Sequence, residues 1–131
     1  MAIEKQVARF GPLKDFIAQG VRVGNTIHLS GQVSVDTAGA TVASGDWTGQ
    51  VRQAYVNVAE VLGHFGATLD NVVSETWFVT DIPAMMREAR GVFGARTEAY
   101  GGPPDTTQTL IQVSALFQPD LLIEIQCVAM V

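Results

Sequence analysis

Glu124 is the residue of this 131-residue chain whose placement most plainly suggests chemistry. It lies near the middle of DLLIEIQCVAM, an apolar run that spans residues 120–130. Ionising a carboxyl group away from water is costly unless a partner or water compensates the charge. A carboxyl group held in a cleft can position or deprotonate a water molecule. Glu124 is therefore either a polar group at a subunit interface or a residue of a reaction site.

Two other polar features could belong to the same site. Ser30 and Gly31 end a predicted strand and could present a hydroxyl and backbone N–H groups, although the chemistry of a turn explains them equally well. Gln108 lies on the predicted strand that precedes the strand of Glu124. Because these strands follow one another in the chain, we expect them to be neighbours, with Gln108 and Glu124 on one face.

Other kinds of site find little support in the sequence. The two histidines, His28 and His64, and the one cysteine, Cys127, do not have the spacing of metal ligands. Cys127 falls on the predicted core side of its strand, where a free cysteine acts as a small apolar group. The glycines do not follow a nucleotide-binding order. We therefore expect neither a metal nor a cofactor.

The charge balance also restricts the partners. Eight Lys and Arg residues face 13 Asp and Glu residues, for a net charge of -5, and the basic residues are scattered. Such a surface repels a phosphate backbone, so nucleic acid is not an expected partner. There is no signal-peptide pattern and no apolar run long enough to span a membrane. We expect a cytoplasmic protein whose single domain covers residues 1–131.

Hydrophobic spacing predicts a β-β-α-β-α-β-β order. The expected elements are a hairpin over 21–32 that turns at Gly24 and Asn25, a helix over 51–65, a strand over 71–80, a helix over 83–100, and strands over 107–117 and 121–131 that join at 118–120. This order indicates an α+β domain, in which two helices cover one face of a mixed sheet.

The uncovered face of that sheet needs a second explanation. In the last strand it would carry both apolar and polar side chains: Leu122, Glu124, Gln126, Val128 and Met130. This mixture is too apolar for free solvent and too polar for a closed core. We therefore expect the face to pack against another subunit.

Three segments, taken in order, match the pattern of a known family. QGVRVGNTIHLSGQVSVD (19–36) is similar to its opening hairpin, residues 50–82 are similar to its first helix and the strand that follows, and IEIQCVA (123–129) is similar to its ending. On these segments the chain resembles the RidA (YjgF) family over nearly its whole length. The resemblance implies a chorismate-mutase-like fold and a homotrimer that binds small molecules in clefts between its subunits.

The resemblance also implies an activity and a set of site residues. Members with the characteristic activity hydrolyse reactive enamines and imines, such as 2-aminoacrylate, to 2-oxo acids and ammonia. The glutamate that activates water corresponds to Glu124. The strand-end serine and glycine correspond to Ser30 and Gly31, and a cleft aromatic corresponds to Phe16. The substrate-binding arginine and a nearby cysteine are replaced here, by Gln108 and Leu110.

The replacement of that arginine bears on the substrate. A guanidinium binds a carboxylate through two charge-assisted hydrogen bonds, whereas a glutamine amide offers only neutral donors. Its loss should weaken carboxylate binding roughly ten- to a hundredfold, unless another arginine supplies the charge from elsewhere in the chain or from the next subunit. The candidates for such a replacement are Arg9, Arg22, Arg87, Arg90 and Arg96.

We therefore expect a RidA-like hydrolase whose substrate is neutral, or larger than a simple imino acid. The alternative is a non-catalytic homotrimer that binds a metabolite or a partner protein in the same cleft. An endoribonuclease, as some members of the family are described, is disfavoured by the acidic surface.

Overall fold

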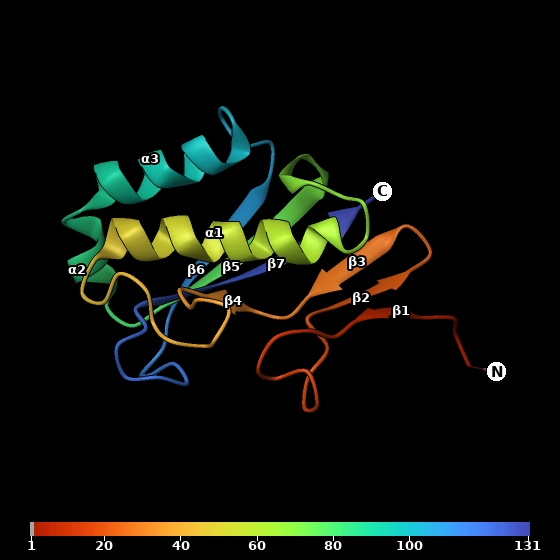
Figure 1. Ribbon diagram of the computed structural model, residues 1–131. Coiled ribbons are helices and arrows are strands. Elements are labelled where there is room, and N and C mark those ends of the chain that lie inside the picture. Colours follow the sequence, from red (N-terminus) through yellow and green to blue (C-terminus); the bar gives the residue numbers. More distant parts are fainter. Residues whose placement is uncertain (1) are drawn as a thin grey trace.

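A mixed β-sheet and a layer of helices make up the computed structural model, which describes residues 2–131 (Figure 1). The strands are β1 (Gln6–Ala8), β2 (Gly20–Val23), β3 (Thr26–Leu29), β4 (Gln32–Val33), β5 (Val72–Val79), β6 (Thr107–Gln112) and β7 (Ile123–Met130). The helices are α1 (Trp47–Gly63), the 3-10 turn η1 (Leu69–Asn71), α2 (Ile82–Met86) and α3 (Ala89–Tyr100). The predicted α+β class is confirmed.

The strand order places β5 between the last two strands of the chain. The sheet runs β1-β2-β3-β7-β5-β6, and β4 also pairs with β7. Strands β5 and β6 are parallel, whereas the other pairs are antiparallel. The expectation that the final two strands are neighbours was wrong, because β6 pairs with β5 and not with β7.

The longest helix, α1, follows its predicted apolar stripe. The side chain of Asp46 caps the helix by accepting a hydrogen bond from the backbone N–H of Gly49 at 3.0 Å. The residues of the stripe are all buried against the sheet: Val51, Ala54, Tyr55, Val58, Val61, Leu62 and Phe65. In Figure 1, α1 and α3 run side by side on one side of the sheet. Because both helices pack on this side, they leave the opposite face of the sheet uncovered.

Three local features differ from the expectation. The second predicted helix is two helices, α2 and α3, separated at Arg87 and Glu88. The last two strands are connected by a loop over 113–122 and not by a tight turn. The short strands β1 and β4 had not been predicted at all, since two or three residues give no periodicity to detect.

The hairpin and the helix ends agree with their turn chemistry. Strands β2 and β3 pair from Val23 and Thr26 outward, and Gly24 adopts a positive φ of 57°. Gly101 ends α3 in the left-handed region, at a φ of 76°. None of the helices within residues 2–131 is long and apolar enough to cross a bilayer.

Candidate functional site

Glu124 lies on β7, on the face of the sheet that the helices leave open. It is paired in register with Val33 of β4 on one side and with Phe78 of β5 on the other. Its chain neighbours Ile123 and Ile125 are fully buried on the helix side. The Glu124 side chain is half-buried, and this burial raises the pKa of its carboxyl group. Glu124 is thus placed to take up or release a proton at a boundary between protein and solvent.

Gly31 lies directly against the carboxyl group of Glu124. A Cβ atom at position 31 would overlap the Glu124 carboxyl oxygen and carbon atoms, so a residue with a side chain would displace them. The neighbouring Ser30 donates its hydroxyl to the carbonyl oxygen of Ala18 at 2.6 Å. This hydrogen bond attaches the end of β3 to the loop at Ala18, so the Ser30 hydroxyl has a structural role. Gly31, which has no side chain, leaves room for the Glu124 carboxyl group.

A cavity of about 550 Å³ opens beside Glu124. We call it the Glu124 pocket, and it is lined by Pro12, Leu13, Ile17, Gln19, Gly31, Gln32, Val33, Val35, Ala38, Gly39, Phe117, Gln118 and Glu124. Most of these side chains are apolar. Among the lining residues in the described part of the chain, Glu124 alone is ionisable. The pocket therefore combines one carboxyl group with apolar walls and a few amides.

The amides in the wall are tied to the protein. Gln32 directs its amide nitrogen to the side-chain oxygen of Gln19 at 2.8 Å and to the carbonyl oxygen of Ser30 at 3.0 Å. Gln118 donates to the carbonyl oxygen of Gly39 at 3.1 Å. These bonds fix the Gln32 and Gln118 side chains, whereas Gln19 takes part through its side-chain oxygen, so its amide nitrogen remains a neutral donor in the wall.

Phe16, the expected cleft aromatic, is not in the wall of the Glu124 pocket. Its side chain is 80% exposed, on the loop that carries Leu13 and Ile17. Phe117, from the loop before β7, lines the pocket instead and is 62% exposed. The sequence pattern offers no reason to select Phe117, because the strand predicted over 107–117 ends at this residue and places it on the side opposite to Gln108.

Gln108 and Leu110 lie on the other face of the sheet. In the parallel pairing, Gln108 is level with Glu75 and Leu110 is level with Trp77, and both Glu75 and Trp77 are buried beneath the helices. The Gln108 amide donates to Glu75 Oε1 at 3.2 Å. The expectation that Gln108 shares a face with Glu124 was therefore wrong. The expectation fails because β6 pairs with β5 and not with β7. The register of the β5–β6 pair decides which residues of β6 lie on each face of the sheet.

Three β6 residues, Thr107, Thr109 and Ile111, face the same side as Glu124, and Thr109 is the middle one. It is exposed, and it pairs with Thr76, which in turn pairs with Gln126 of β7. The sequence of β6, TQTLIQ, contains no lysine or arginine. Neither face of β6 therefore presents a basic side chain.

A buried polar group that the sequence did not predict occupies the helix side of the sheet. We call it the Glu75 cluster. The carboxylate of Glu75 accepts hydrogen bonds from the hydroxyl groups of Tyr55 at 2.9 Å and Tyr100 at 2.8 Å, and from the amide of Gln108. It also forms an ion pair with Arg96. Burial, with the nearby Glu75 charge, raises the pKa of Tyr55 and Tyr100. With its acceptors satisfied, this cluster joins α1 and α3 to the sheet.

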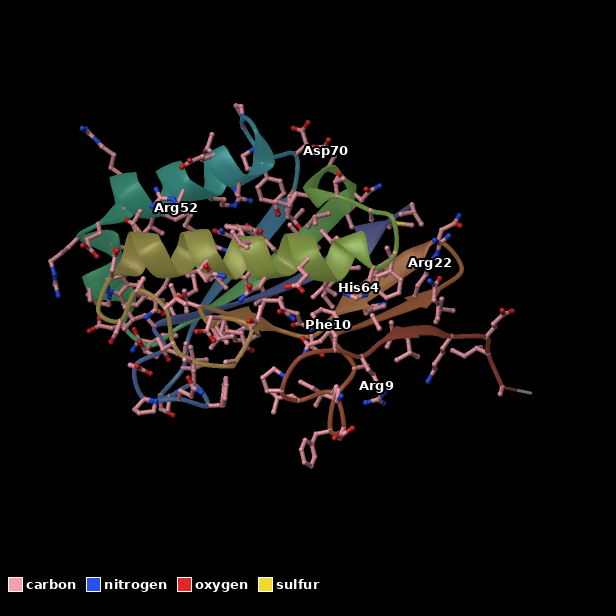
Figure 2. All side chains as sticks on the ribbon, in the orientation of Figure 1. Arg9, Phe10, Arg22, Arg52, His64 and Asp70 are labelled. Carbon is pink, nitrogen blue, oxygen red and sulfur yellow. The ribbon has the colours of Figure 1, made fainter. Side chains whose placement is uncertain are left out.

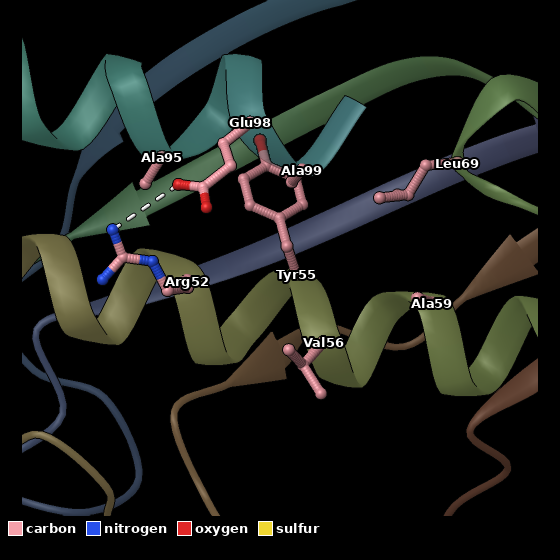
Figure 3. Close-up of a pocket in the computed structure, with 8 residues that line it drawn as sticks. All are labelled: Arg52, Tyr55, Val56, Ala59, Leu69, Ala95, Glu98 and Ala99. Carbon is pink, nitrogen blue, oxygen red and sulfur yellow. Dashed lines mark ion pairs between the residues drawn. The ribbon is translucent and has the colours of Figure 1, made fainter. Parts of the chain in front are cut away.

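A shallow groove of about 300 Å³ lies between α1 and α3 (Figure 3). Arg52 and Glu98 form an ion pair at 3.6 Å across it, and Tyr55 contributes part of its wall. Both charged side chains are well exposed, and the Tyr55 hydroxyl is engaged with Glu75. The polar groups of this groove are thus already engaged, Arg52 and Glu98 with each other and Tyr55 with the Glu75 cluster.

The remaining candidates have structural roles. Phe10 and His64 stack with ring centroids 4.2 Å apart, at the end of α1 (Figure 2). Cys127 is buried, and burial raises the pKa of its thiol, which makes it a poor nucleophile. Within residues 2–131, no three His, Cys, Asp or Glu side chains group as a metal site would require.

The chain is similar to known proteins over most of its length. The family described as Endoribonuclease L-PSP matches residues 7–131. A RutC family protein of Pyrococcus abyssi is 29% identical over 128 residues, which are 96% of this chain and 91% of that protein. A 2-iminobutanoate/2-iminopropanoate deaminase of Capra hircus is 35% identical over 78 residues, which are 60% of this chain and 54% of that protein.

The same similarity holds for the fold. The crystal structure of a YjgF/YER057c/UK114 family member from Mycobacterium tuberculosis superposes with a TM-score of 0.80 at 27% identity. The alignment covers 98% of this chain and all of that one. The sheet and the helices described above are therefore those of a known architecture.

Proposed function

The chain belongs to the Endoribonuclease L-PSP family, also known as YjgF/RidA, and on this basis we propose that it hydrolyses reactive imines or enamines in the Glu124 pocket. The observation that carries this proposal is the half-buried Glu124 carboxyl group, which closes one side of a cavity large enough for a small metabolite and water. The related deaminases support the reaction class.

The proposed reaction needs only water and one carboxylate. Glu124 accepts a proton from a water molecule while the water oxygen bonds to the imine carbon. This proton passes to the substrate nitrogen, Glu124 then moves the second oxygen-bound proton to the same nitrogen, and the C–N bond breaks to release ammonia and a carbonyl compound. The raised pKa of Glu124 suits this exchange, since a base is most effective when its pKa is near the working pH.

The charge of the pocket limits the substrate. A substrate carboxylate about 4 Å from an ionised Glu124 would be repelled by roughly 1 kcal/mol in water and about 4 kcal/mol at the dielectric of a protein surface. Gln108, which replaces the expected arginine, lies on the other face and offers no compensation. We therefore propose that simple 2-imino acids are poor substrates.

We also propose that the protein assembles as a homotrimer through the open face of the sheet. This face includes the apolar side chains Ile111, with 40% of its area exposed, and Met130, with 49% exposed. Apolar groups on an uncovered sheet face are stabilised by packing against a second copy. The exposed Phe16 could be covered in the same assembly.

RNA cleavage is not part of the proposal. The net charge of -5 disfavours association with a phosphate backbone, and among the described residues that line the pocket Glu124 alone carries a charge.

The experiment is to generate an imine in situ and to follow its decay and the release of ammonia with the wild-type protein and with Glu124→Gln. Acceleration that depends on Glu124 supports hydrolysis. Saturable ligand binding without any acceleration would favour the non-catalytic alternative. Light scattering on the same samples should give three times the chain mass of 14.0 kDa.

A further inference from the structure

Resting on the proposed function, we infer that the Glu124 pocket selects positively charged iminium ions that derive from primary amines and carry an apolar substituent. The pocket has one ionisable side chain in its described lining, and that side chain is an acid. An imine nitrogen that carries a proton is the reactive form, because protonation makes its carbon more electrophilic. An anionic Glu124 would bind this cation and also activate the water that attacks it.

The hydrogen-bond donors of the pocket point to the same class of ligand. A carboxylate that enters a protein site needs several donors or a cation to replace its water. The amide nitrogens of Gln32 and Gln118 are already directed at protein oxygen atoms. The loop that carries Leu13 also contains two basic residues, Arg9 and Lys14, but neither of them lines the cavity. Within one subunit, a carboxylate would therefore exchange its hydration for neutral amide donors such as Gln19, without a cation among the described lining residues.

The walls favour an apolar substituent on the imine. Leu13, Ile17 and Phe117 form one side of the cavity, and each has at least a third of its surface exposed. Contact with an aliphatic or aromatic group would remove this apolar area from water. A cavity of about 550 Å³ holds more than the three carbon atoms of 2-aminoacrylate and its tautomer 2-iminopropanoate.

The reaction is balanced with water as the only co-reactant. An iminium R–CH=NH2+ and water give the aldehyde R–CHO and ammonium: the C–O bond forms, the C–N bond breaks, and Glu124 carries both water protons, one after the other, from oxygen to nitrogen. No electron is transferred. Such an iminium is produced by the two-electron oxidation of a primary amine, so an amine-oxidising reaction must supply the substrate. The aldehyde product must then be consumed by an oxidation or a reduction.

The test compares two imines that differ by one carboxylate. Oxidation of 2-phenylethylamine by an amine oxidase and of phenylalanine by an amino-acid oxidase gives imines with the same phenyl group. The protein should accelerate decay of the amine-derived imine, with kcat/KM at least about tenfold higher than for the imino acid, the ratio expected from 1.4 kcal/mol of differential binding. Equal values, or a preference for the imino acid, would overturn the inference but leave the proposed function intact. Acceleration of neither imine, or equal rates for wild type and Glu124→Gln, would overturn both.

A charge introduced into the wall provides a second, independent readout. Leu13 is partly exposed at the pocket, so Leu13→Lys should be tolerated by the fold and should bring a cation near the ligand. We expect it to lower the preference for the amine-derived imine by about tenfold. Val56→Lys adds the same charge on the exposed side of α1 and should leave the ratio unchanged. Equal ratios in the two variants would contradict charge selection in the pocket.

Discussion

Glu124 and Gln108 lie on opposite faces of the sheet. Gln108 donates a hydrogen bond to the buried Glu75 beneath the helices, whereas Glu124 borders a cavity on the open face. Two side chains on opposite faces cannot bind one small ligand within a subunit. The chemistry that we propose therefore depends on Glu124 and its pocket, and Gln108 belongs to the packing between sheet and helices.

This geometry makes a prediction for the arginine that the family resemblance leads one to expect. Gln108→Arg should give no gain in turnover of 2-aminoacrylate, because the new guanidinium would lie beside Arg96 and Glu75. Thr109→Arg places the same charge on the face of Glu124 and serves as the matched comparison. Both are checked by ammonia release from 2-aminoacrylate formed in situ. A clear gain in Gln108→Arg alone would contradict the assignment of faces.

The contact between Gly31 and Glu124 predicts that even one methyl group will matter. Gly31→Ala should shift the Glu124 carboxyl group, since the added Cβ would overlap it. The backbone at Gly31 is not in the left-handed region, so the fold should tolerate alanine. We expect kcat to fall by about tenfold or more, as for other small displacements of catalytic groups, while the melting temperature changes little. Unchanged kcat would show that the position of the carboxyl group is not critical.

The raised pKa of Glu124 predicts how stability depends on pH. Between the usual glutamate pKa of about 4.3 and the raised pKa, the folded protein holds a proton that the unfolded chain has released. The stabilising contribution of this group is present below that window and is lost as the pH rises through it. Glu124→Gln removes the titration.

This variant should therefore melt at a higher temperature than wild type near neutral pH. The difference should disappear below about pH 4. Thermal unfolding followed by circular dichroism at several pH values measures it. A variant that is less stable than wild type at neutral pH would mean that the ionised carboxylate is well compensated in the folded state.

The Glu75 cluster should contribute strongly to stability. Glu75→Ala leaves the Arg96 guanidinium and two tyrosine hydroxyls without their shared acceptor. Breaking one side of a buried ion pair costs about 3 to 5 kcal/mol. Chemical denaturation should show this loss in the free energy of unfolding.

An exposed ion pair provides the control for that measurement. Glu98→Ala removes the carboxylate that pairs with Arg52, where both side chains are more than half exposed. Its cost should be below about 1 kcal/mol. If Glu75→Ala were no more destabilising than Glu98→Ala, the cluster would not be a stabilising element.

The elements with a strong local pattern were predictable from the sequence. The apolar stripe of α1, the β2–β3 turn at Gly24 and the core side of β7 were all found where expected, because each follows from the spacing of neighbouring residues. Glu124 was also placed on the correct side of its strand by simple alternation.

The pairing of β6 could not be predicted in the same way. Its sequence TQTLIQ has polar and apolar residues on both faces, so alternation gives no preferred side. Its face is set by register with β5, a strand about 30 residues earlier in the chain. The Glu75 cluster was missed for a related reason, since its members lie between 20 and 33 residues from Glu75 and share no local spacing.

The measurement that tests the central claim most directly is the rate of imine decay with Glu124→Gln, compared with wild type and with Glu98→Gln. Both variants exchange one carboxylate for an amide, but Glu98 is exposed on α3, far from the pocket lining. General-base catalysis typically contributes about 100- to 10,000-fold. We therefore predict a loss of at least about a hundredfold in kcat/KM for Glu124→Gln and no loss for Glu98→Gln. Equal catalysis by wild type and both variants would contradict the assignment of Glu124 as the catalytic residue.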